Sequence, residues 1–107
     1  MARTLVQVPA SARRGEVLAL RTLIAHPMET GYRPDASGAV LPRDIIRSFS
    51  CRYNDELVFG VDLSPAIAAN PYLAFHIVAT TSGTLSFSWE GDQGFSQTEI
   101  ATLNVSA

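Results

Sequence analysis

The chain has 107 residues and a net charge of −2, and its single cysteine excludes an internal disulfide. This length is typical of one domain. All eight cationic side chains are arginine, too few for the basic surface that nucleic-acid binding requires. No apolar run reaches the roughly 18 residues of a membrane-spanning helix, and no basic amphipathic segment favours a membrane surface. Charged residues make up only 17% of the chain, so we expect a partner to cover part of its surface.

Segments with the alternating apolar and polar pattern of β-strands follow one another along the chain. Turn chemistry separates them: residues 11–15 and 54–56 are predicted turns, and Ser64 is placed to cap a single helical turn within residues 64–71. The pattern predicts an all-β, immunoglobulin-like antiparallel β-sandwich of about seven strands, forming a single domain over residues 1–107. The predicted strands are residues 4–8, 17–25, 45–53, 57–63, 72–79, 85–90 and 95–105.

One segment, residues 27–44, interrupts this pattern. Pro27 ends the preceding strand because proline cannot donate to a sheet ladder, and the segment holds three prolines and two glycines. Loops of this length in a compact domain are usually functional or disordered. Met28, Tyr32 and Arg33 belong to residue types enriched at interfaces, so we expect an ordered loop that makes a contact.

Cys51, the single cysteine, is the candidate for a reactive thiol. It lies between Phe49 and Tyr53 on a face that is predicted to point into the core, where burial would make it unreactive. Alternatively, this face meets a partner and Cys51 forms an intermolecular disulfide in an oxidising compartment. The sequence leaves both possibilities open.

The remaining residues do not form a motif for catalysis, metal binding or a cofactor. His26, His76 and Cys51 lack the spacing of metal ligands, and a closed site needs about four ligands. Glu29 would either pair with Arg33 or be a solvated loop charge. Asp92 is predicted to lie in a turn. The arginines at positions 33, 43 and 47 would either gather an anion or form an exposed charged face. The sequence therefore predicts no enzyme and no cofactor.

Two segments of the chain resemble a known family. They are residues 26–33, with the sequence HPMETGYR, and residues 65–73, with the sequence PAIAANPYL. They are similar to SoxZ, a subunit of the SoxYZ carrier of bacterial thiosulfate oxidation. The resemblance extends over nearly the whole chain and includes residues 15–17, 42–46 and 82–85.

The resemblance implies a non-catalytic subunit that pairs with SoxY in a heterodimer. SoxY carries the sulfur substrate covalently on a glycine-flanked cysteine at the end of a mobile arm, and other Sox enzymes dock transiently to process it in the periplasm. Residues 104–107 contain no such cysteine, so we expect this chain not to bear the sulfur. Residues 1–9 contain no apolar stretch of a secretory signal, and the resemblance implies export together with a signal-bearing SoxY.

Three hypotheses remain. In the first, the chain is the scaffold subunit of this heterodimer. In the second, it is an enzyme or redox centre that uses His26, His76 and Cys51, and in the third it is a generic β-sandwich module for adhesion or carbohydrate binding. The residues that the first hypothesis places at a partner surface are His26, Met28, Glu29, Tyr32, Arg33, Asn70 and Tyr72.

Overall fold

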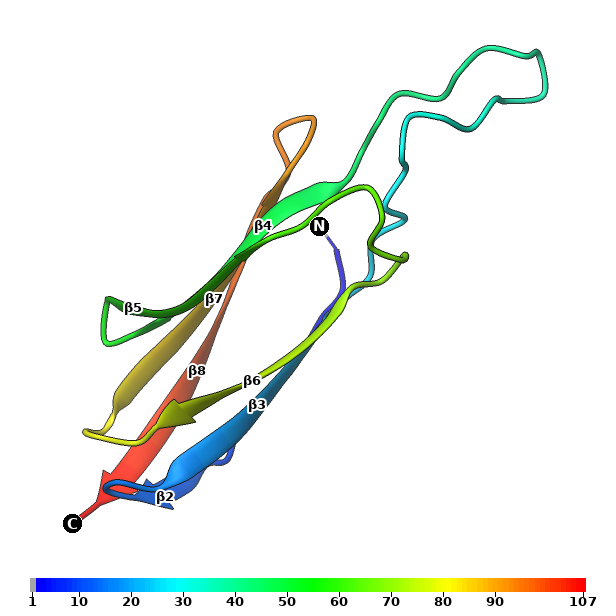
Figure 1. The fold of residues 1–107 in the computed structure, drawn as a ribbon. Helices are drawn as coiled ribbons and strands as arrows, with labels where there is room; N and C mark the ends of the chain where they lie inside the picture. The colour runs from blue at the N-terminus through cyan, green and yellow to red at the C-terminus, as the bar shows by residue number, and fades with distance from the viewer. Residues whose placement is uncertain (1) are drawn as a thin grey trace.

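The computed structural model describes residues 2–107, which fold into two facing β-sheets (Figure 1). The three-stranded sheet has the order β1-β3-β6 and the five-stranded sheet the order β2-β8-β7-β4-β5. Within residues 2–107 no helix is long and apolar enough to cross a membrane. The strands are β1 (Thr4–Gln7), β2 (Ser11–Arg13), β3 (Val17–Ile24), β4 (Ile46–Tyr53), β5 (Glu56–Asp62), β6 (Tyr72–Val78), β7 (Gly83–Gly91) and β8 (Ser96–Ser106).

The alternation of the sequence decides which side chains face the core. Along β3 every second residue is buried, because successive side chains of a strand point to opposite faces of the sheet. The inward set is Leu18, Leu20, Thr22 and Ile24. Strand β4 likewise buries Phe49, Cys51 and Tyr53, which confirms the predicted core face of that strand.

Aromatic rings fill the space between the two sheets. Phe49 lies at the centre, with its ring centroid 5.2 Å from that of Trp89 and 5.9 Å from that of Phe75 on the opposite sheet. Phe75 stacks in turn on Phe59 of β5, at 4.3 Å and an interplanar angle of 7°. Offset and edge-on contacts of this kind add to the burial of the rings, so the two sheets meet through this cluster.

Two local predictions need correction. Residues 11–13, which were predicted to be part of a turn, form the short strand β2, which pairs in parallel with residues 104–106 of β8. The sandwich of residues 2–107 therefore has eight strands and one parallel pair. Residues 64–71 form turns and no helix: the Ile67 amide donates to the Ser64 carbonyl at 3.0 Å, but no further helical bonds follow. Pro71 and the approach of Asn70 to residue 26 stop a helix from continuing.

The molecule is elongated, with extents of 61 × 20 × 20 Å. Much of this length comes from residues 25–45, between β3 and β4, which project beyond one end of the sandwich (Figure 1). The C-terminus lies at the opposite end. The segment that the sequence singled out as a presenting loop is therefore the most protruding part of the molecule.

The aromatic cluster gives a test of the fold. Replacing Phe49 with Ala should lower the free energy of unfolding by about 3–5 kcal/mol, since the ring is 1% exposed and its loss leaves a cavity between the sheets. The exposed Ile100 on β8 is the control, and its replacement by Ala should cost less than about 0.5 kcal/mol. Urea unfolding followed by tryptophan fluorescence measures both. Equal losses for the two variants would contradict the assignment of the core.

Candidate functional site

The projecting segment, residues 25–45, is an irregular hairpin rather than an open loop. Its two arms are joined by antiparallel bridges between Glu29 and Asp44 and between Pro34 and Val40. The amides and carbonyls of Glu29 and Asp44 exchange two hydrogen bonds of 2.8 Å. These bonds give the segment a defined shape, in agreement with the prediction of an ordered loop.

A carboxylate fixes the far turn of this hairpin. One oxygen of Asp35, Oδ1, accepts hydrogen bonds from the amide and hydroxyl of Ser37, at 2.8 and 2.7 Å, and from the amide of Ala39 at 3.1 Å. These bonds, above all the one from the Ser37 hydroxyl, hold the pKa of Asp35 below its usual value. Gly38 follows with a φ of 89°, which only glycine adopts readily. The turn is therefore set by its own side chains, without help from the sandwich.

Five of the seven predicted contact residues lie on this hairpin, and three of them, Glu29, Tyr32 and Arg33, have exposed or half-buried side chains. Tyr32 is 81% exposed. The Arg33 guanidinium donates to the Glu29 carboxylate from Nη2 at 2.6 Å and from Nε at 3.2 Å, so the pairing that the sequence left open is present. The hydrogen bond from Arg33 lowers the pKa of Glu29, and the same bond raises that of Arg33. The hairpin thus presents an exposed aromatic ring, Tyr32, and an exposed guanidinium, Arg33, which the half-buried Glu29 carboxylate holds in place.

The other two predicted contact residues on the hairpin, His26 and Met28, have buried side chains. Their exposed fractions are 5% and 4%, which corrects the expectation that their side chains meet a partner directly. His26 Nδ1 accepts the Met28 amide at 3.1 Å, and its ring lies edge-on to Phe95 at 5.1 Å. The Met28 sulfur accepts the Ile46 amide at 3.3 Å. Both side chains hold the base of the hairpin from within.

Asn70 ties the second motif segment to the first. Its side-chain Oδ1 accepts a hydrogen bond from the backbone amide of His26 at 2.9 Å, and the backbone amide of Asn70 donates to the His26 carbonyl at 2.7 Å. Asn70 adopts a φ of 54°, a left-handed conformation that asparagine tolerates better than most residues. The two segments that carry the family resemblance are therefore in direct contact, although 44 residues separate these two positions.

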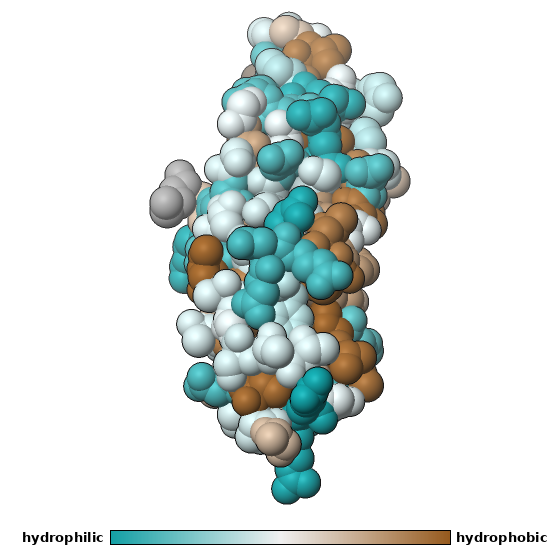
Figure 2. All heavy atoms as spheres, turned by 90° about the vertical axis from the view of Figure 1, so that its left-hand side faces the viewer, coloured by the Kyte–Doolittle hydropathy of each residue, from teal (hydrophilic) through white to brown (hydrophobic). Residues whose placement is uncertain are grey.

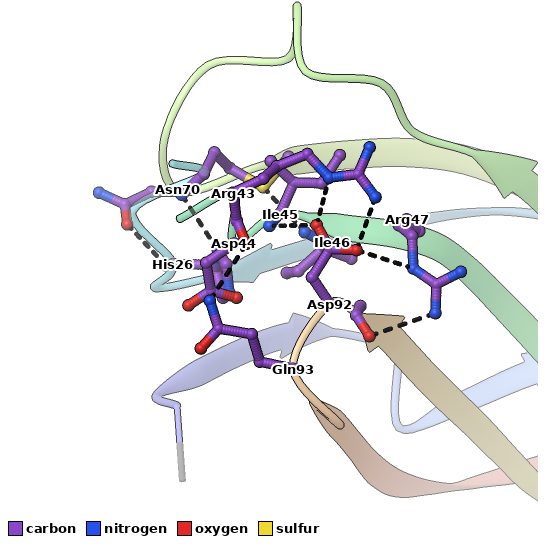
Figure 3. A network of polar contacts seen from close by, with 11 residues as sticks. His26, Arg43, Asp44, Ile45, Ile46, Arg47, Asn70, Asp92 and Gln93 are labelled. Atoms are coloured by element: carbon purple, nitrogen blue, oxygen red, sulfur yellow. Dashed lines mark hydrogen bonds and ion pairs between the residues drawn. The ribbon is translucent and has the colours of Figure 1, made fainter. Parts of the chain in front are cut away.

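The second anchor of the hairpin is Asp92, in the β7–β8 turn (Figure 3). Its carboxylate lies 2.7 Å from Arg43 Nε and 3.3 Å from Arg47 Nε, and it accepts the Ile45 amide at 3.2 Å. The Gln93 side chain adds a bond from Nε2 to the Arg43 carbonyl at 3.1 Å. The hydrogen bond from Arg43 is the main cause that lowers the pKa of Asp92. The arm that leads into β4 is thus fixed to the five-stranded sheet.

Sequence reasoning missed this anchor. It placed Asp92 correctly in a turn but gave it no partner, and it described Arg43 and Arg47 as an exposed face or an anion site, whereas both arginines pair with the Asp92 carboxylate. No local signal reveals a contact between residues 43 and 92, which lie 49 positions apart. Gly31 is the one local sign that the two arms of the hairpin lie close together. Its φ of 88° favours glycine, and a Cβ at this position would lie only 2.9 Å from the Cβ of Arg43.

The remaining predicted site residues lie apart from the hairpin. Cys51 is fully buried, and burial raises the pKa of its thiol to about 11, so the structure describes the buried alternative rather than a thiol accessible to a partner. Tyr72 is 58% exposed on the outer side of the three-stranded sheet, and His76 lies on the same side. Among residues 2–107 no three His, Cys, Asp or Glu side chains cluster as metal ligands would.

The lowered pKa of Asp92 predicts how stability depends on pH. A carboxyl group with a depressed pKa in the folded state stabilises that state above its unfolded pKa of about 4, and this contribution is lost as the pH falls through the folded-state pKa. Asp92→Asn should therefore be less stable than the wild type at pH 7, and the difference should shrink between pH 5 and pH 2.5. Urea unfolding at four pH values measures it.

The exposed Asp62, at the end of β5, provides the control for this experiment. Asp62→Asn should follow the wild-type curve at every pH. A stability difference for Asp92→Asn that stayed constant from pH 7 to pH 2.5 would show that the charge of Asp92 does not stabilise the base of the hairpin.

Solved structures with the same fold include superoxide reductases and a sulfur carrier protein. A superoxide reductase (neelaredoxin) from Ignicoccus hospitalis is 15% identical, with a TM-score of 0.73 and coverage of 98% of this chain and 82% of that chain. The sulfur carrier protein SoxY from Chlorobium limicola f thiosulfatophilum is 11% identical, with a TM-score of 0.68 and coverage of 97% and 79%. A putative superoxide reductase from Thermotoga maritima is 12% identical, with a TM-score of 0.75 and coverage of 97% and 86%. At these identities the matches establish the immunoglobulin-like β-sandwich fold.

The family is established by the sequence. No curated protein matches the chain. Residues 6–102, however, match the family described as "Sulphur oxidation protein SoxZ", and this range includes both motif segments, the whole hairpin and the Asp92 anchor. Membership of that family implies a role in Sox sulfur oxidation and association with SoxY. The chain belongs to the SoxZ family.

Proposed function

We propose that this chain is the non-catalytic scaffold subunit of a SoxYZ heterodimer in the periplasm. In this role it supports the SoxY subunit that carries covalently bound sulfur intermediates during thiosulfate oxidation. The observation that carries the proposal is the family match over residues 6–102. We place the chain in the periplasm because its partner would bring it there by export of the pair.

The chemistry of the described residues is consistent with a subunit that binds and does not react. The Cys51 thiol is fully buried with a pKa of about 11, so little thiolate forms near neutral pH and none is accessible for carrying sulfur. His26 is used as an acceptor for the Met28 amide, inside the base of the hairpin. The sulfur chemistry of the pair is therefore assigned to SoxY and to the enzymes that act on it.

The hairpin is suited to docking those other Sox enzymes. It protrudes from the end of the sandwich, and it presents the exposed side chains of Tyr32 and Arg33, the latter paired with Glu29. Tyrosine and arginine are enriched among residues that dominate binding energy. Because bonds at the turn and at the base already fix its shape, docking would cost little conformational entropy.

Variants of the hairpin test the docking role. Tyr32→Ala and Arg33→Ala should lower thiosulfate turnover in a reconstituted Sox system by about tenfold, the effect of losing roughly 1.4 kcal/mol of binding. Their unfolding free energies should stay within about 0.5 kcal/mol of the wild type, because both side chains are exposed. Arg52→Ala, at an exposed position of β4, is the matched control. Normal turnover with both hairpin variants would remove the docking role.

Association with SoxY is tested by co-expression. We expect the chain and a SoxY-type subunit from the same organism to co-purify as a stoichiometric pair, and Cys51→Ala to pair as well as the wild type, because the thiol is buried. Mass measurement under native conditions, with and without reductant, reads out the result. A stable monomer that does not bind SoxY would favour the generic β-sandwich module instead. A pair that dissociates in reductant would support the hypothesis of an intermolecular disulfide at Cys51.

A further inference from the structure

His26 is a buried titratable side chain at the base of the hairpin, and each of its ring nitrogens faces a polar group (Figure 3). Nδ1 accepts a hydrogen bond from the Met28 amide at 3.1 Å. Nε2 lies 3.7 Å from Oδ1 of Asp44, on the opposite arm. A neutral imidazole accepts at one nitrogen and donates from the other, so the bond from Met28 assigns the proton of the neutral ring to Nε2. The neutral ring therefore meets both arms of the hairpin.

The bond at Nδ1 holds a residue whose backbone is strained. Met28 has a φ of 52°, in the left-handed region that residues other than glycine rarely adopt. Such a conformation persists only where several contacts fix it together. The second contact of Met28 is its sulfur, which accepts the amide of Ile46, the first residue of β4, at 3.3 Å. His26 and β4 thus hold Met28 from two sides.

Protonation of the ring would remove one of its contacts and strengthen the other. The imidazolium ion has a hydrogen on both nitrogens, so Nδ1 can no longer accept the Met28 amide, and two donors would face each other there. At Nε2 the new positive charge attracts the Asp44 carboxylate. The first effect disfavours the charged ring and the second favours it. Both are satisfied only if the ring leaves Met28 and moves closer to Asp44.

No other free charge lies against the ring. Among residues 2–107, Asp44 is the only charged side chain within ion-pair distance of His26. The other charged side chains near the base of the hairpin are paired with one another: Glu29 with Arg33, and Asp92 with both Arg43 and Arg47.

The remaining elements around His26 contribute neutral groups. From the β7–β8 turn, Phe95 places its ring edge-on at 5.1 Å. Residues 64–71 contain no charged residue, and Asn70 bonds only the backbone of His26. Arg3, before β1, is exposed and lines a hollow on the outer side of the three-stranded sheet. The response of the ring to acid is therefore set by Met28 and Asp44.

Protons can reach this buried ring from the side of Asp44. The His26 side chain is 5% exposed, whereas that of Asp44 is 35% exposed. Hydrophilic side chains, teal in Figure 2, are numerous on the upper part of the molecule, toward the hairpin. Because the Met28 amide occupies Nδ1, that nitrogen can take up a proton only after the bond has opened. Proton uptake and release of Met28 are thus one event.

We propose that His26 is a pH-dependent latch of the hairpin. The neutral ring holds Met28 through Nδ1, and the protonated ring releases Met28 and pairs with Asp44. Imidazoles change charge between about pH 5 and pH 8, so mild acid opens the latch. Met28 is then free to leave its left-handed conformation, and the arm that presents Tyr32 and Arg33 moves with it.

The latch changes the shape of the hairpin without unfolding its base. The bonds between Asn70 and the backbone of His26 do not depend on the charge of the ring, and the ion pairs of Asp92 stay in place. This conformational device goes beyond the scaffold role proposed above. Its test uses the full chain without SoxY, so its failure would leave that role untouched.

Hydrogen exchange at the Met28 amide tests the latch, with NMR detection at pH 7.5 and pH 5.5. His26→Asn is the decisive variant, because an asparagine side chain accepts the amide two residues on and does not titrate. His76→Asn, at the other histidine of the chain and exposed on β6, is the matched control. The protection factor should fall about tenfold at pH 5.5 in the wild type and in His76→Asn, as expected for one lost hydrogen bond. In His26→Asn it should change less than twofold.

Asp44→Asn tests the second contact of the ring. It removes the charge that receives the protonated ring, so the loss of Met28 protection should require a lower pH than in the wild type. Three results would overturn the latch: ring signals of His26 that do not change between pH 7.5 and 5.5, ring signals that change while Met28 stays protected, or an equal loss of protection in His26→Asn. Circular dichroism verifies the fold of each variant, and if His26→Asn does not fold, the first two results in the wild type decide the question.

Discussion

The position of the projecting hairpin on the sandwich depends first on one carboxylate, Asp92. Its two oxygens meet two guanidinium groups and a backbone amide, so both the charge and the hydrogen-bonding capacity of the group are used. On the other arm, His26 and Asn70 exchange hydrogen bonds through backbone and side chain. Each arm of the hairpin is thus tied to a different part of the sandwich. A segment rich in proline and glycine takes a defined shape because its base is tied to the sandwich and its far turn is held by Asp35, and not because its middle is buried.

The period of two in β-strands explains both the core and the two different outer faces. The same alternation that buries Leu18, Leu20 and Ile24 turns Val17, Arg21 and Leu23 outward. In the five-stranded sheet the outward positions hold serine and threonine among charged residues and the exposed Leu57 and Ile100, and in the three-stranded sheet they hold mainly apolar residues. The low content of charged residues therefore has a structural location. Among the outward positions of β1, β3 and β6, only Arg21 is charged.

Local patterns predicted most of the fold. Strand identity and the inward face follow from neighbouring residues alone, and the structure agrees for β3 and β4. The short strand β2 escaped prediction because residues 11–13 carry turn-like residues and become a strand only by pairing with the distant C-terminal strand. The site was predicted less completely. Glu29, Tyr32 and Arg33 lie on an exposed hairpin as expected, whereas His26, Met28 and Cys51 are interior side chains.

The sequence by itself determined the all-β class, the alternating core faces, the position of the projecting segment and, through two motif segments, the SoxZ family. These properties depend on the types of residues that lie close together in the sequence, so they can be predicted from neighbouring positions alone. Only the tertiary structure decided that Asp92 anchors the hairpin, that residue 70 meets residue 26, and that the row of Leu5, Leu23 and Tyr72 is continuous. Those contacts join residues that are far apart in the chain, and strand order and register must exist before such residues can meet.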